Sequence, residues 1–157
     1  MTKSKFNTKQ LVLAALCVAL GVVLPVAFHS IPNAGSVLLP MHIPVLLCGL
    51  VCGPVYGLLS GILTPLLSSM ITGMPPIAYL PGMLCELAAY GLVSGVLWHK
   101  VKHTVPMMYA SLVTAMVAGR LVWGAVRFVL AGLTGSSFPF SAFLSGALLT
   151  AVPGIVA

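Results

Sequence analysis

The chain has 157 residues, of which 60% are hydrophobic and only 5% are charged, whereas about a quarter of the residues in soluble domains are charged. This composition indicates a membrane protein, and the length allows at most about six spans of roughly 20 residues, which excludes a separate soluble catalytic or nucleotide-binding domain. The net charge of +6 comes largely from lysines at the ends of apolar segments, which is typical of cytoplasmic flanks and not of a nucleic-acid-binding surface.

Six apolar segments follow one another along the chain, separated by short stretches that are rich in Gly, Pro and Ser. In chain order they cover residues 11–28, 41–52, 55–71, 80–98, 105–130 and 138–157. The second segment is too short to cross a full bilayer, so we expect a short tilted span or a re-entrant hairpin there. The predicted fold is one all-α integral membrane domain, residues 1–157, with six transmembrane helices of which the second is short.

The distribution of lysines predicts how these helices are oriented. Lysines precede the first segment and lie between the fourth and the fifth, at Lys3, Lys5, Lys9, Lys100 and Lys102. Because basic residues are held on the cytoplasmic side, six crossings place both termini in the cytoplasm, with residues 1–10 as a cytoplasmic tail. The uncharged loops 29–39, 72–79 and 132–137 would then share the outer face and cover a polar-lined pocket.

The two ends of the chain carry further signals. Basic residues precede the first segment, but Pro25 follows its apolar stretch and no cleavage site is clear, so we expect a retained span and not a signal peptide. At the other end the chain stops at Ala157 without a polar tail, which is compatible with a truncated last span.

Three charged side chains fall inside apolar segments, where a charge is costly and usually functional. Glu86 lies in the fourth segment, and Arg120 and Arg127 lie in the fifth. Arg120, Trp123 and Arg127 are spaced i, i+3, i+7 and therefore share one helical face. Two guanidiniums, one carboxylate and an indole would suit a small anion or carboxylate, with Trp123 stacked on a planar or apolar moiety.

A purely structural role for the same residues stays open. Arg127 could extend its charge to the membrane interface, and Glu86 could pair with Arg120 to lock two helices together. The sequence does not decide whether Glu86 contacts Arg120 or Arg127. His42, just before the short second helix, could contact a ligand or titrate, or it could cap the helix. The other histidines are weaker candidates: His29 in the first outer loop, and His99 and His103 at the cytoplasmic interface.

The remaining small and sulfur-containing residues predict packing and not chemistry. The four cysteines show no zinc-ligand spacing, so we expect buried free thiols, no metal and no cofactor: Cys17, Cys48, Cys52 and Cys85. Small residues recur every four positions, which lets helices approach closely in lipid: Gly49, Gly53, Gly57, Gly61, Gly91, Gly95, Ala15 and Ala19. The two alanines lie on a helix otherwise covered by Leu and Val, so a contact with a separate protein is an alternative there.

The chain resembles the substrate-binding S components of energy-coupling factor (ECF) vitamin transporters. The resemblance covers nearly the whole length and rests on the size, the six spans, the lysine-bearing N-terminus, Ala15-x-x-x-Ala19 and the segment MHIPVLLCGLVCGPVYGLLSG at 41–61. It implies a plasma-membrane subunit, not itself an enzyme, that captures a water-soluble vitamin or related micronutrient outside the cell. The first outer loop and the outer halves of the last three helices would form the pocket.

The resemblance also implies partners. Ala15 and Ala19 would dock on a transmembrane coupling subunit that is itself bound to two ABC-type ATPases. The S component would then topple in the bilayer and carry its pocket to the cytoplasmic side. The chain itself has no Gly-rich phosphate loop followed by Lys and Ser/Thr, so ATP hydrolysis is expected only in the partner subunits.

The substrate and two other classes of function stay open. Two arginines against one glutamate favour a carboxylate-bearing molecule such as pantothenate or niacin, whereas a neutral vitamin fits if Glu86 and Arg120 neutralise each other. The alternative is a small stand-alone secondary transporter with Glu86 as its proton-coupling site, although no inverted repeat is visible. A membrane enzyme is disfavoured because no nucleophile–base pair is recognisable, and a purely structural subunit because two arginines and a tryptophan share one face.

Overall fold

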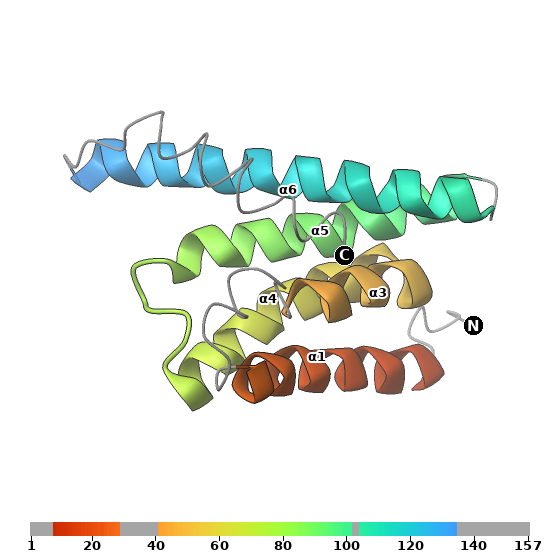
Figure 1. The fold of residues 1–157 in the computed structure, drawn as a ribbon, viewed down its shortest axis with the longest axis horizontal. Coiled ribbons are helices and arrows are strands. Elements are labelled where there is room, and N and C mark those ends of the chain that lie inside the picture. The colour runs from red at the N-terminus through yellow and green to blue at the C-terminus, as the bar shows by residue number, and fades with distance from the viewer. Residues whose placement is uncertain (1–7, 29–40, 102–103, 135–157) are drawn as a thin grey trace, which may run out of the picture.

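The computed structural model describes residues 8–28, 41–101 and 104–134, and these ranges form helices joined by short loops, with no strand among them. In chain order the helices are α1 Thr8–Phe28, α3 His42–Cys52, α4 Pro54–Thr72, α5 Leu80–Lys100 and α6 Val105–Thr134 (Figure 1). Among the described helices, α1, α4, α5 and α6 are long and apolar enough to cross a membrane. The short α3 has 11 residues, as the length of the second apolar segment predicts.

The first five predicted segments are therefore helices, and the structure corrects two details. Residues 132–134, expected to begin a loop, still belong to α6, because a single glycine costs a helix only about 1 kcal/mol and does not have to end it. Cys85, expected to be buried, is exposed on α5. The sixth segment, the loop 29–39 and its His29, and His103 lie outside the described residues, so the six-helix count and the sides of the termini remain predictions.

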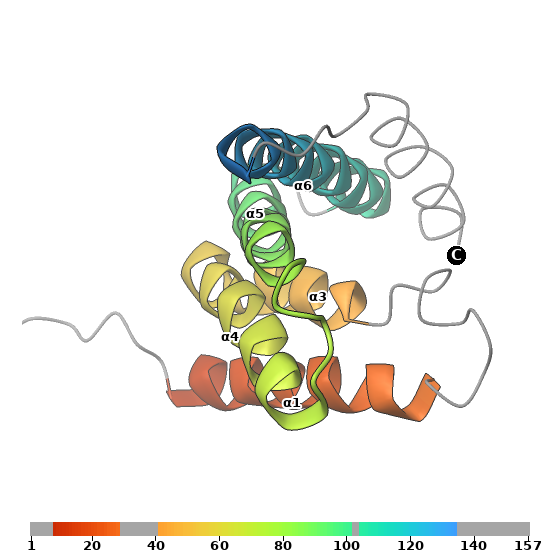
Figure 2. The ribbon, with the colours of Figure 1, turned by 90° about the vertical axis from the view of Figure 1, so that its left-hand side faces the viewer.

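The helices are stacked in layers. Figure 2 shows α6 above α5, with α3 and α4 below, and α1 crossing the base of the stack at a steep angle to α4, α5 and α6. The start of α1 lies at the same end of the bundle as the connection between α5 and α6 (Figure 1). The predicted positions of Lys9 and Lys100 at one face of the membrane are compatible with this arrangement.

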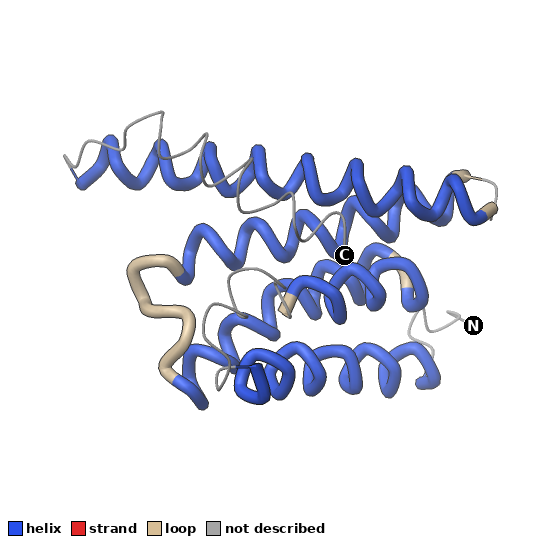
Figure 3. Tube along the Cα trace, viewed as in Figure 1, coloured by secondary structure: helices blue, strands red, loops and turns tan. Residues whose placement is uncertain are grey.

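Two glycines make the sharp connections between the helices. Gly53 separates α3 from α4 with φ 95°, and Gly73 ends α4 in the left-handed region with φ 72°, where a side chain would be strained. The loop that follows α4, shown between α4 and α5 in Figure 3, is held by hydrogen bonds from the Ser68 hydroxyl to the Met74 carbonyl (2.8 Å) and from the Ser69 hydroxyl to the Pro75 carbonyl (3.0 Å).

Most of the predicted glycine stripe packs inside the protein. A Cβ atom at Gly91 on α5 would overlap the backbone of Gly57 on α4, and one at Gly61 would overlap the backbone of Leu87. Gly49 on α3 meets Gly91 in the same way. These contacts bring the backbones of α3, α4 and α5 together without intervening side chains. Gly53 is the exception, because it serves the turn and not a helix–helix contact.

An apolar cluster of buried side chains lies where α3, α5 and α6 meet. Its buried members are Met41, Val45, Leu46, Leu87, Tyr90 and Ala115. Burial of these side chains fixes the three helices relative to one another. The polar side chains at this junction are therefore held by rigid helices and not by loops.

Candidate functional site

Glu86 is the centre of a buried polar cluster built from α3, α5 and α6. Its carboxylate is buried, with the residue only 2% exposed, and its Oε1 atom lies 3.3 Å from Nη1 of Arg120 on α6. The same oxygen accepts a hydrogen bond from the Tyr90 hydroxyl at 2.7 Å and lies 3.8 Å from Nε2 of His42 on α3. Three helices thus converge on one carboxylate oxygen.

Helical spacing explains how α5 and α6 supply this cluster. Glu86 and Tyr90 are four residues apart and therefore share one face of α5. Tyr90 can approach α6 because the facing residue is Gly119, where an added Cβ atom would overlap the tyrosine ring. Arg120 is the next residue of α6, and its guanidinium reaches the Glu86 carboxylate. The small residue and the arginine beside it form one unit of the site.

The structure answers the question of which arginine pairs with Glu86. Arg120 is the partner, and the side chains of both residues are largely buried, with 15% and 3% exposure. Since Glu86 is the only acidic side chain in the chain, removing it would leave a guanidinium inside the bundle without its counter-ion. The pair ties α5 to α6, so the structural role that the sequence left open is present in the geometry.

His42 is the least satisfied member of the cluster. It is 6% exposed, and neither ring nitrogen has a hydrogen-bond partner within the described part of the chain. Its ring lies 5.2 Å from that of Tyr90 at an interplanar angle of 57°. A buried polar group without a partner costs about 1–3 kcal/mol. The described residues therefore leave His42 with unused hydrogen-bonding capacity directly beside Glu86.

A second cluster surrounds Arg127, which lies nearer the C-terminal end of α6 than Arg120 does. The guanidinium carbon lies 4.8 Å from the ring centroid of Tyr79 and 5.9 Å from that of Trp123. Gly82 on α5 leaves room for the indole, since a Cβ atom there would stand 3.2 Å from Trp123 Cδ1. Guanidinium groups bind favourably over aromatic faces. Tyr79 was not among the site residues expected from the sequence; its position as the last residue of the predicted outer loop 72–79, just before α5, was the available signal.

The two clusters lie along one contact between α5 and α6. Arg120 and Arg127 are two helical turns apart, or roughly 10 Å along the axis. The structure thus brings Glu86, Arg120 and His42 together. Trp123 and Arg127 lie apart from them, on the same face of α6 as Arg120. The intramembrane charges of Glu86, Arg120 and Arg127 sum to +1. The two clusters together provide positive charge and aromatic surface within an apolar bundle.

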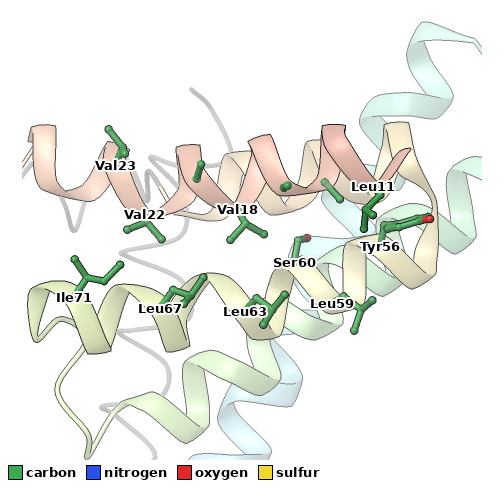
Figure 4. A pocket seen from close by; sticks show the side chains of 13 residues that line it. Leu11, Val18, Val22, Val23, Tyr56, Leu59, Ser60, Leu63, Leu67 and Ile71 are labelled. Atoms are coloured by element: carbon green, nitrogen blue, oxygen red, sulfur yellow. The ribbon is translucent and has the colours of Figure 1, made fainter. Parts of the chain in front are cut away.

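Ala15 and Ala19 lie far from both clusters, on the other side of the molecule. Both are exposed on α1 and line an apolar groove between α1 and α4 with a volume of about 560 Å³ (Figure 4). Val18 and Val22 of α1 face Leu63 and Leu67 of α4 across this groove (Figure 4). Ala14 of α1 also lines this groove and is buried against Tyr56 and the cysteines of α3.

These features define a multi-pass membrane protein with a charged site inside an apolar helical bundle. A family model described as ECF transporter, substrate-specific component, matches residues 9–157. The chain belongs to this family and is thus a membrane-embedded, substrate-binding subunit for transport by an ECF importer. No curated protein and no solved structure matches the chain.

Proposed function

We propose that this subunit captures a small, carboxylate-bearing micronutrient, of the kind represented by pantothenate or nicotinate, for ATP-driven uptake through partner subunits. The observation that carries the proposal is the excess of positive charge in the bundle: two arginines against the single acidic residue of the chain, Glu86. With Glu86 beside Arg120 at 3.3 Å, the two arginines leave one positive charge in excess, which attracts an incoming carboxylate.

The cluster around Arg127 is the first contact that we propose for this carboxylate. A guanidinium presents two parallel N–H donors to a carboxylate, and Tyr79 and Trp123 hold the side chain from two ring faces. The rings would also cover a planar or apolar part of the ligand. A charge-assisted hydrogen bond contributes about 1.5–3 kcal/mol, which corresponds to roughly 10- to 100-fold in affinity.

Matched ligand pairs test this assignment in the purified protein. Nicotinate and nicotinamide, or pantothenate and panthenol, differ chiefly in the carboxylate, and their dissociation constants can be measured by titration calorimetry. We expect Arg127→Gln to weaken binding of the carboxylate member roughly 10- to 100-fold and to leave the neutral member unchanged. Arg127→Lys serves as the matched control, because it keeps the charge and loses the two-pronged donor geometry.

A neutral vitamin is a second candidate substrate, and one observation favours it. Glu86 and Arg120 lie close enough to neutralise each other, which reduces the demand for an anionic ligand. Preferential binding of nicotinamide or panthenol over the matching carboxylate would support this candidate and contradict the carboxylate proposal.

We infer that the partner subunits contact the α1 surface that contains Ala15 and Ala19. The small side chains expose the α1 backbone to close approach by another helix, and aliphatic side chains line most of the groove beside them. A transmembrane coupling subunit carrying two ABC-type ATPases is the proposed occupant. This assignment separates the surface for coupling, on α1 and α4, from the clusters for substrate, on α3, α5 and α6.

A further inference from the structure

Glu86 stands between two side chains that can carry positive charge. Its Oε1 atom is 3.3 Å from Nη1 of Arg120 and 3.8 Å from Nε2 of His42. The first distance is that of an ion pair, and the second is too long for a hydrogen bond but within the range of one after a small side-chain movement. The carboxylate can therefore be neutralised from either side.

Protonation would give the buried His42 ring a partner. As a neutral ring it is buried with both nitrogens lacking partners among the described residues, whereas a protonated ring would have the Glu86 carboxylate as its counter-ion. His42 is also the first residue of α3, and the preceding residue, Met41, provides no side-chain cap. A helix N-terminus opposes positive charge, so an imidazolium at this position needs compensation from the Glu86 carboxylate and from a bound anion.

We propose, resting on the proposed function, that capture of an anionic substrate is coupled to protonation of His42. The imidazolium takes over Glu86 as its partner, and the Arg120 guanidinium, released from Glu86, receives the substrate carboxylate after its first contact at Arg127. One proton and one monoanion enter together, so the charges of His42, Glu86 and Arg120 sum to zero before binding, and with the bound carboxylate they sum to zero after it. This balance matters within a bilayer, where an uncompensated charge is costly.

The other groups around His42 do not provide the same function. From α5 it faces Glu86 and Tyr90, and from α6 Arg120; carboxylates, phenols and guanidiniums ionise well outside the neutral range in which histidine does. On α1 no titratable residue follows Cys17 within the helix, and in α4 Tyr56 is the only one. The Tyr56 side chain packs with Cys48 and Cys52 at the opposite end of α3.

Calorimetric titration of the full chain in detergent tests the coupling, with nicotinate and pantothenate as probes and nicotinamide and panthenol as neutral controls. With one proton taken up per carboxylate bound, the dissociation constant of the carboxylate should rise with pH, by up to about tenfold per pH unit. Titrations in buffers of different ionisation heat should show uptake of about one proton per carboxylate bound. The neutral controls should show neither effect.

Variants assign the effect to His42. His42→Gln should abolish proton uptake and flatten the pH dependence, whereas His99→Gln, at the exposed end of α5 where His99 contacts the Gly95 carbonyl, should retain both. Proton uptake by the unmodified chain is a readout that does not depend on the folding of any variant.

Each other outcome overturns a defined part of the account. Carboxylate binding without proton uptake, or uptake that survives in His42→Gln, overturns the coupling and leaves the proposed function standing. Binding of only the neutral members overturns both the carboxylate assignment and the coupling. Binding of none of the four contradicts the proposed substrate class, and the coupling with it.

Discussion

Glu86 is the residue on which the described site depends most. As the only acidic side chain of the chain, it is the counter-ion of Arg120, the acceptor for Tyr90 and the nearest charged neighbour of His42. The presence of three intramembrane charges could be predicted from the sequence, because they interrupt apolar runs. Their pairing could not, because it depends on the rotation of α5 and α6 about their axes, which packing determines.

Replacement of the carboxylate tests how strongly this pairing stabilises the bundle. Glu86→Gln keeps the shape of the side chain and an acceptor for Tyr90, but it leaves Arg120 buried without its counter-ion. We expect a loss of about 3 kcal/mol, the lower end of the range for breaking a buried pair, since Arg120 retains some exposure. Thermal and denaturant unfolding in detergent measure the change.

The double variant Glu86→Gln/Arg120→Gln is the control for this experiment. It removes both charges and should recover part of the stability that the single variant loses, because no uncompensated charge remains. A single variant as stable as the unmodified chain would show that the pair does not hold the helices together.

The five described helices could be predicted from the sequence, because each is an apolar run and the runs are separated by helix-breaking or charged residues. The predicted boundary between the second and third segments at Gly53-Pro54 is confirmed, and α4 ends at Thr72, one residue beyond the predicted segment 55–71. The end of α6 was missed because Gly132 resembles a breaker, although its neighbours allow the helix to continue. Tyr79 was missed because aromatic residues beside loops are common, and only the fold brings this one to Arg127.

The contact between α4 and α5 makes a quantitative prediction at the same scale. Gly91→Ala places a methyl group against the backbone of Gly57, and backbone cannot rotate away as a side chain can. We expect a destabilisation of about 3 kcal/mol, the upper part of the usual range for overpacking, measured by thermal unfolding in detergent.

Gly132→Ala is the matched control, because nothing lies within 4 Å of a Cβ atom there. In the described part of α6 this change should be neutral or stabilise the helix by up to about 1 kcal/mol. Equal effects of the two substitutions would contradict the view that backbone proximity between α4 and α5 determines the packing.

As a whole, the molecule places its charged clusters and its exposed alanine surface on different helices. Membership of the ECF family makes transport driven by partner subunits the leading mechanism over a stand-alone carrier with Glu86 as its proton-coupling site. Uptake that requires ATPase partners, and not only a proton gradient, distinguishes the two mechanisms. The proton coupling proposed for His42 acts on substrate affinity and is compatible with ATP-driven uptake.

The separation of the two surfaces predicts separable defects. Ala15→Leu combined with Ala19→Leu should abolish uptake in cells while leaving the dissociation constant of the purified subunit unchanged, because bulky side chains prevent close approach by the partner helix. Ala110→Leu, on the exposed part of α6 and outside the groove, is the control and should leave uptake intact. Normal uptake in the double variant would show that the partner docks elsewhere.

What the protein retains during purification tests whether the chain captures a small carboxylate-bearing micronutrient. The measurement is extraction of the detergent-solubilised protein followed by mass spectrometry of the released small molecules. The account predicts a carboxylate-bearing, water-soluble compound at close to one per chain. A neutral vitamin at that ratio would contradict the substrate class, and a protein that retains nothing and binds none of the four matched ligands would contradict the capture of such a molecule.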